Sequence, residues 1–252
     1  MPMLPRPIRL SSGFGLVRSV RLPSGERVRV LQAGGVYQGA SYEGARRMEP
    51  VFAYIKGFDT CFDVRPEARN VLMVGGGAFA WPKHVADTRP GVHVDVVELE
   101  AGVINAARKH FYLDEAMADH PDAIGLLWGD GRAYVEGCNK RYDAIVLDAF
   151  AGIDPVYSLA TTEFFAACAK RLTPGGVVLA NVVSNEEGAD VEFLQSFMAS
   201  AATSFKHVEV RLVNNDEYAV EDNYLVVASN ELFELEGSMP YDEDFLGPVL
   251  HD

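Results

Sequence analysis

Glycines or acidic residues lie at the ends of four apolar segments of this chain. The first segment, 71–74, runs into three consecutive glycines, 75–77, and Glu98 closes the second segment, 21 positions after the last glycine. Asp130 follows the third segment and Asp148 the fourth. Glycine lets a ligand approach the backbone closely, and a carboxylate at a strand end can accept hydrogen bonds from both hydroxyls of a ribose. The spacing therefore indicates a site for an adenosine-containing ligand.

Two kinds of adenosine ligand fit these residues. Gly75, Gly77 and Ala80 satisfy the GxGxxA form of a nicotinamide-dinucleotide fingerprint, which leaves a nicotinamide oxidoreductase open. A sulfonium donor uses both further acids: one can hydrogen-bond the adenine amino group, and the other can orient a nucleophile and accept its proton. Asp148 as a cap of the following turn is an alternative. We expect no metal, because the histidines lie apart and no HExxH or Cys/His cluster occurs.

From residue 71 onward, strand and helix patterns alternate along the chain. This alternation predicts an α/β fold with a doubly wound, Rossmann-like, mostly parallel sheet of seven strands. The last two strands follow one another without a helix and should be antiparallel neighbours. The expected strands are 71–74, 92–99, 124–128, 144–148, 177–183, 207–213 and 223–229, and the expected helices are 82–88, 101–111, 131–137, 161–172 and 190–203.

The first part of the chain has a different pattern. Two alternating runs within 16–31 surround a Pro/Gly turn and predict a β-hairpin. Apolar residues at helical spacing predict a helix over 47–56. We therefore expect three parts: a small N-terminal β appendage (1–45), the Rossmann-like domain (46–230) and an acidic tail (231–252) that either packs on the domain or a partner subunit or is disordered.

Composition restricts the possible partners. The formal net charge of -14 disfavours nucleic acid as a partner. The apolar runs are far shorter than the roughly 18 residues of a membrane span, and the first residues lack the apolar stretch of a signal peptide. Three widely spaced cysteines fit reduced thiols. We expect a cytoplasmic protein that acts on a small molecule.

The motifs GGG, VVELE, GDGRAYV, YDAIVLDAF and TTEFFAACAKRLTPGGVVLANVV, together with GGVYQ before them, resemble the spermidine synthase family of class I S-adenosylmethionine-fold transferases. The resemblance implies a homodimer or higher oligomer and a base, Asp148, that prepares an attacking amine. It also implies that Glu98 holds the ribose and that Gln38 reaches into the pocket from the appendage. By the same resemblance, the residues that border the donor's tail are Gly75, Gly76, Gly77 and Ala78, and those at the adenine are Asp130 and Gly131.

The chain departs from the family pattern at places that concern the substrates. Ala78 stands where the family has an acid suited to a free amino end. By an ungapped count Arg47 begins the stretch that replaces the family's Tyr-His-Glu, and the second acid of a later motif is displaced to Asp154. Phe79 and Phe150 add apolar surface. We expect Phe79, Phe150 and Asp154 to bind an acceptor larger or less charged than putrescine.

These departures lead to a main expectation and two alternatives. Burying an ammonium without a matched acid costs several kcal/mol, so we expect methyl or other alkyl transfer from S-adenosylmethionine to an amine or hydroxyl. The first alternative is genuine aminopropyl transfer from decarboxylated S-adenosylmethionine, with acceptor acids drawn from Glu43, Glu49, Asp154 or the segment 214–223. The second is a non-catalytic protein that binds a nucleoside or a partner.

Overall fold

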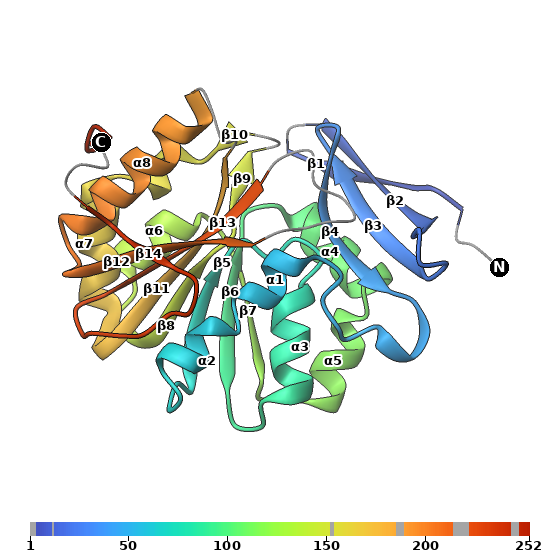
Figure 1. Cartoon of the computed structure of the whole chain (residues 1–252). Coiled ribbons are helices and arrows are strands. Elements are labelled where there is room, and N and C mark those ends of the chain that lie inside the picture. The colour runs from blue at the N-terminus through green and yellow to red at the C-terminus, as the bar shows by residue number, and fades with distance from the viewer. Residues whose placement is uncertain (1–3, 12, 152–153, 185–188, 214–221, 243–246) are drawn as a thin grey trace.

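Two β-sheets organise the chain (Figure 1). The computed structural model describes residues 4–11, 13–151, 154–184, 189–213, 222–242 and 247–252; for 150–151, 154–155, 184 and 189–191 it describes the backbone alone. One sheet has eight described strands and helices on both faces, and the other is a four-stranded antiparallel sheet beside it. The α/β, Rossmann-like class is confirmed by this architecture.

The eight-stranded sheet runs in the order β14-β12-β13-β11-β8-β5-β6-β7. Its strands β5, β6, β7, β8 and β11 are parallel to their neighbours within this group, and β11, β13, β12 and β14 pair antiparallel. The predicted antiparallel pairing of the last two long strands is confirmed, whereas the strand number is corrected by the short β14. The strands are β5 (Asn70–Val74), β6 (His93–Glu98), β7 (Ile124–Trp128), β8 (Tyr142–Leu147), β11 (Leu172–Ser184), β12 (His207–Val213), β13 (Asp222–Ser229) and β14 (Met239–Pro240).

Strand β5 shows why the central strands are apolar throughout. Val71 and Met73 belong to the core on one face of the sheet, and Leu72 and Val74 belong to the core on the other. A parallel strand that is covered on both faces needs apolar side chains at every position. Chain order leaves β5 for β6 on one side and returns to β8 on the other, which creates a switch point at the carboxyl end of β5.

Most predicted helices form close to their expected bounds: α3 (Ala80–Thr88), α4 (Ala101–His110), α6 (Gly131–Gly137), α7 (Thr162–Arg171) and α8 (Ala189–Ala202). A further helix, α5 (Leu113–Asp119), follows α4 after Tyr112, whose φ of 62° ends the first helix. The prediction of a single helix over 47–56 is wrong. The structure has η1 (Gly44–Arg46), α1 (Ala53–Gly57) and α2 (Thr60–Val64). Phe52 is extended, and it belongs to the core cluster that includes Val30 and Ala40 of the four-stranded sheet.

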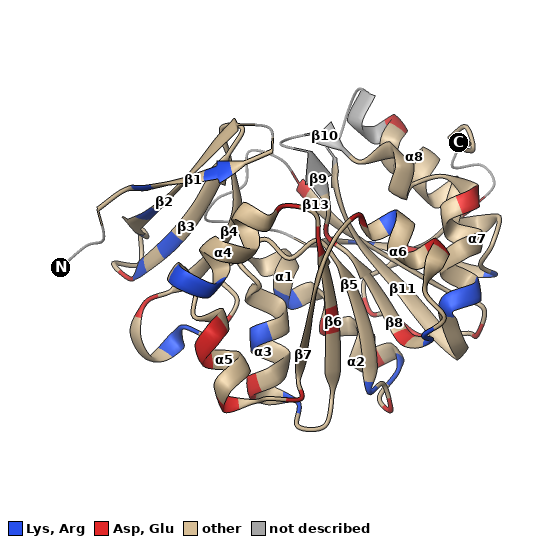
Figure 2. Cartoon of the chain, turned by 180° about the vertical axis from the view of Figure 1, so that it is seen from behind, with Lys and Arg blue, Asp and Glu red and all other residues tan. Residues whose placement is uncertain are grey.

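The N-terminal sheet consists of β1 (Arg6–Leu10), β2 (Gly13–Arg21), β3 (Arg27–Ala33) and β4 (Val36–Tyr42), and Figure 2 shows basic residues on β1, β2 and β3. The predicted hairpin is the β2–β3 pair, which the structure extends to four strands. Strand β1 approaches α4 so closely that a Cβ on Gly102 would collide with the Arg9 carbonyl oxygen. Val17, Leu31 and Ala78 share an apolar cluster across this junction.

Residues 247–252 lie against the helices α7 and α8. The Thr162 amide donates to the Leu250 carbonyl at 2.9 Å, and the Leu250 amide donates to Ser200 Oγ at 2.9 Å. Among the described residues no helix combines the length and apolar character that a membrane span requires. No cluster of three or more metal-ligating side chains occurs in the described part of the chain.

Candidate active site

A cavity of about 990 Å³ opens at the carboxyl ends of the central strands and extends beneath the N-terminal sheet. This volume lies within the range of small-molecule sites, and the position is the one that open α/β sheets use for ligands. Both sheets contribute to its lining. The polar side chains among the lining residues are Ser11, Gln32, Tyr37, Gln38, Tyr54, Glu98, Glu100, Asp130, Arg132, Asp148, Ser158, Asn181 and Asn223.

The glycine turn after β5 is bare because three segments of the chain meet on it. A Cβ on Gly75, whose φ is 92°, would collide with the Asp148 carbonyl oxygen. A Cβ on Gly77, whose φ is 50°, would collide with the Gln38 carbonyl oxygen. Gly76 likewise lies under the Phe79 ring. The turn is therefore in direct contact with the end of β8 and with β4, and Gly75 and Gly77 line the cavity.

Glu98 ties the next strand end to this turn. Its Oε2 accepts hydrogen bonds from the Gly76 amide at 2.8 Å and the Gly77 amide at 3.3 Å, while Oε1 accepts from the Glu100 amide at 2.8 Å. The side chain is buried, and this burial raises the pKa of Glu98 although the three amides favour its charged form. Two carboxylate oxygens can accept about four hydrogen bonds, so one further hydroxyl can bind here.

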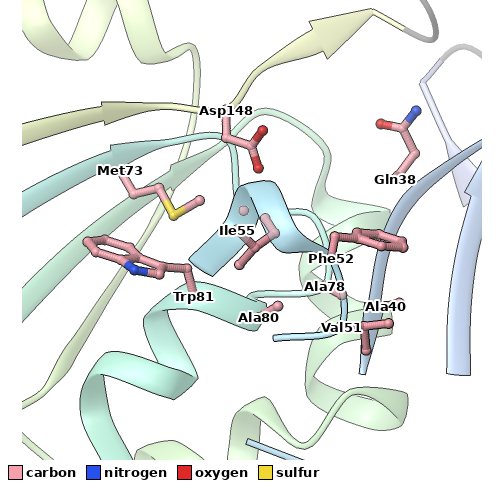
Figure 3. A pocket seen from close by; sticks show the side chains of 12 residues that line it. Gln38, Ala40, Val51, Phe52, Ile55, Met73, Ala78, Ala80, Trp81 and Asp148 are labelled. Atoms are coloured by element: carbon pink, nitrogen blue, oxygen red, sulfur yellow. The ribbon is translucent and has the colours of Figure 1, made fainter. Parts of the chain in front are cut away.

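Asp148 follows β8 and lies between the two sheets (Figure 3). Burial raises the pKa of Asp148 to about 7, and the nearby charge of Glu98 adds to this effect. Asn181 Nδ2 donates to Asp148 Oδ1 at 3.2 Å and partly offsets it. A carboxylate with a pKa near neutrality can accept a proton from a substrate and release it again at neutral pH.

Asn181 is a candidate site residue that the sequence reasoning missed. Its side chain is 9% exposed and lines the cavity from β11, and within the described structure its Oδ1 has no hydrogen-bond partner. Buried polar atoms are rarely left unpaired, so this oxygen is suited to a ligand donor. Tyr54 and Asn223 line the same end of the cavity. The signal was present: a lone amide interrupts the apolar run 177–183, just as Glu98 interrupts an earlier run.

The end of β7 forms the opposite part of the cavity. Asp130 caps α6, because its Oδ1 accepts from the Ala133 amide at 2.7 Å. A Cβ on Gly131 would collide with Val74, so this glycine permits α6 to pack on β5. Both residues line the cavity, and so does Arg132 beside them, which was not predicted.

A second, smaller cavity of about 10 Å³ adjoins the first, and Figure 3 shows its lining. Asp148 and Gln38 line both cavities. Ala78 lines the small one and is 2% exposed, packed on Gly39 so tightly that a Cβ there would lie 2.6 Å from the Ala78 amide nitrogen. Ala78 therefore lies in the close packing between β4 and the glycine turn.

Of the three predicted acceptor residues, Phe79 is the one whose side chain the structure describes, and it does not line the cavity. Phe79 is fully buried in the core, with a φ of 52°, and lines neither of the two cavities. Phe150 and Asp154 belong to a short strand pair, β9 (Phe150–Ala151) and β10 (Asp154–Pro155), and their side chains lie outside the described residues.

The other charged residues considered for the acceptor are engaged elsewhere. Glu43 pairs with Arg27 at 2.8 Å, and Glu49 pairs with Arg46 at 2.8 Å. Arg47, expected to enter the acceptor pocket, instead pairs with Glu115 on α5. Residues 214–221, most of the acidic segment considered above, lie outside the described residues.

Comparison with known proteins identifies the family. Residues 53–188 match the model of the spermine/spermidine synthase domain, and the chain belongs to this family. It is similar to polyamine aminopropyltransferase 2 of Hyperthermus butylicus, with 36% identity over 118 residues, which is 46% of this chain and 39% of that protein. The chain thus matches well under two thirds of that curated relative.

Solved structures share the fold. A probable spermidine synthase from Corynebacterium glutamicum superposes with a TM-score of 0.77 and 19% identity, over 99% of this chain and 97% of that one. A spermidine synthase solved in complex with the transition-state analogue AdoDATO gives a TM-score of 0.68 and 20% identity, over 91% and 72% of the two chains. At these identities the likeness describes the fold.

These findings correct the expected reaction. Methyl or other alkyl transfer from intact S-adenosylmethionine is contradicted, because the matching curated relatives are named polyamine aminopropyltransferases. The matching family model likewise describes a spermine/spermidine synthase domain. The expectation relied on Ala78 as a change of substrate charge, whereas this residue is buried against Gly39.

Proposed function

We propose that this protein transfers an aminopropyl group from decarboxylated S-adenosylmethionine to an amine of a diamine or polyamine. The observation that carries the proposal is the charge of the cavity. Its described lining contains four carboxylates, of Glu98, Glu100, Asp130 and Asp148, and one cationic side chain, Arg132. That guanidinium is already bound to Asp252 and Glu136.

This charge favours the decarboxylated donor over the intact one. Decarboxylated S-adenosylmethionine carries a sulfonium and an ammonium, both positive, and no carboxylate. A cavity lined by carboxylates attracts such a dication, whereas the carboxylate of the intact donor would meet like charges without a free cation among the described lining residues to pair with it. The names of the relatives agree with this preference.

The roles of the residues follow from their positions. Glu98 and Asp130 lie at neighbouring strand ends and would bind the ribose and the adenine amino group. Asp148 would accept a proton from the attacking amine, whose nitrogen forms a bond to the propyl carbon as the bond from that carbon to sulfur breaks, leaving methylthioadenosine. The Asn181 side-chain NH2 group would orient Asp148, and the unpaired Asn181 oxygen would accept a hydrogen bond from the amine substrate.

The test is a product assay with two donors and several acceptors. Purified protein is incubated with decarboxylated or intact S-adenosylmethionine and with putrescine, cadaverine or spermidine, and methylthioadenosine and the alkylated amine are quantified together. We expect both products in equal amounts from the decarboxylated donor alone. Methylated amine from the intact donor, or no turnover with any acceptor despite tight methylthioadenosine binding, would contradict the proposal.

A further inference from the structure

One guanidinium in the wall of the cavity connects three separate segments of the chain. Arg132 is the second residue of α6, directly after Gly131, and its side chain is 17% exposed. Its Nη1 donates to the Ser158 carbonyl at 2.8 Å and to Asp252 Oδ1 at 2.7 Å, while Nη2 donates to Asp252 Oδ2 at 2.5 Å. A bidentate pair of this kind fixes the plane of the guanidinium.

Asp252 is itself held by the start of α7. The Thr161 hydroxyl donates to Asp252 Oδ1 at 2.8 Å, and the Asp252 amide donates to Glu163 at 3.2 Å. Two residues before Asp252, the Leu250 carbonyl accepts a hydrogen bond from the Thr162 amide. We call residues 247–252 the strap, because they run along α8 and across the start of α7 to the cavity wall.

The segment 156–161 lies between the strap and the cavity. Val156, Ser158 and Leu159 line the cavity. In the sequence, residues 149–155 connect Asp148 to this segment. Within it the Leu159 amide donates to the Val156 carbonyl and the Ala160 amide to the Tyr157 carbonyl, each at 2.9 Å. Arg132 links this segment to α6, because it donates to the Ser158 carbonyl and to the Thr161 hydroxyl.

We infer that Arg132 and Asp252 are positioning residues for nucleoside binding: the strap fixes Arg132, and Arg132 holds the segment 156–161 against the end of the cavity next to Asp130 and Gly131. The inference deepens the proposed function and depends on it for the identity of the nucleoside. Neither residue reacts with substrate. Loss of either should weaken binding of the adenosine part while leaving the chemical step of the saturated enzyme nearly unchanged.

The experiment compares D252N, D252E and R132M with the unmodified protein and a control, D114N. Asp114 forms an exposed pair with Arg108 on the surface, so its removal tests for a general effect of losing a carboxylate. Methylthioadenosine affinity is measured by calorimetry, and amide hydrogen exchange is followed in 156–161. We expect D252N to weaken affinity by about 3- to 10-fold, R132M by at least as much, and both to speed exchange at Leu159 and Ala160. D252E should restore most of the affinity, and kcat of D252N should fall by less than about 2-fold.

The outcomes separate this inference from the proposed function. Equal affinity and equal exchange in D252N and the unmodified protein would overturn the positioning role. Faster exchange in D252N, in a protein that binds no methylthioadenosine, would support the strap and defeat the proposed nucleoside site. A drop in kcat as large as the loss of affinity would also overturn the inference, because it would place Arg132 in the chemical step.

Discussion

The two ends of the cavity collect their side chains over very different lengths of chain. The glycine-turn end consists of Gly75, Gly77, Glu98 and Asp130, which lie at the carboxyl ends of three adjacent parallel strands, β5, β6 and β7. The Asn181 end consists of Tyr54, Asn181 and Asn223, which come from α1, β11 and β13. One end is therefore a local consequence of strand order, and the other exists only after distant segments have packed together.

Asp148 lies where the two ends meet, and its replacement should have the largest effect. In D148N the side chain keeps its size but cannot accept a proton, so kcat should fall by about 10²- to 10⁴-fold. Methylthioadenosine binding, measured by calorimetry, should stay nearly unchanged, because the proposed adenosine contacts lie at the glycine-turn end. A variant that loses binding as strongly as turnover would show that Asp148 belongs to the glycine-turn end.

The pH profile checks the same role independently. Asp148 must be deprotonated to act as a base, and burial raises its pKa to about 7. Activity should therefore fall as pH decreases through about 7, and kcat/KM at saturating donor should show this limb. The limb should be absent from whatever residual activity D148N retains.

Gly75→Ala should disrupt the junction between the two ends. The φ of 92° strains any other residue, and the new Cβ would collide with the Asp148 carbonyl oxygen. We expect a loss of about 3 kcal/mol or more in the free energy of unfolding, measured by urea denaturation. Gly137→Ala is the control, because nothing lies within 4 Å of its Cβ position at the end of α6, and it should be neutral or slightly stabilising. Equal stability of the two variants would contradict the packing role of the turn.

The difference between the two ends explains what the sequence could predict. Glu98, Asp130 and Asp148 were identified because each closes an apolar strand, and the parallel order brings such ends together. Asn181 interrupts its apolar run instead of closing it, but a lone amide in such a run was a visible signal, so this residue was predictable. Phe79 was not, because a sequence cannot show that a left-handed residue after a glycine turn directs its ring into the core.

Larger errors arose where tertiary packing determined the local structure. The spacing of apolar residues in 47–56 is helical, yet these residues pack against the N-terminal sheet, and the first α-helix begins at Ala53. The place of Arg47 depended on an ungapped count through this region. Ala78 required knowledge of Gly39, which lies on another sheet.

Lys83 connects α3 to the N-terminal sheet, and its burial predicts how the stability of the fold depends on pH. Its Nζ donates to Ser41 Oγ at 2.7 Å and to the Phe111 carbonyl, and the side chain is fully buried. Burial lowers the pKa of Lys83 from 10.5 to about 7; the charge of Arg29 acts in the same direction and that of Glu115 opposes it. Between these two pH values the unfolded chain binds more protons than the folded one, so this residue makes stability rise with pH.

The measurement is urea denaturation of the unmodified protein and K83M at pH 7, 8 and 9. The stability difference between the two should change in favour of the unmodified protein as pH rises, by at most about 1.4 kcal/mol per pH unit. Below about pH 7 both states of Lys83 are protonated, and the difference should become constant. Parallel stability curves from pH 7 to 9 would mean that Lys83 is not buried as a folded-state amine.

Arg47→Ala should have the smallest effect, and it separates the cavity from its surroundings. Arg47 pairs with Glu115, with side-chain exposures of 34% and 39%, and such pairs contribute about 1 kcal/mol or less. Since neither of the two described cavities includes Arg47 in its lining, KM for a diamine acceptor should change by less than about 2-fold. A tenfold fall in that KM would instead show that the guanidinium repels the acceptor. The Asn181 end would then include the start of α1 and the residues before it, and the acceptor's charge would be selected there.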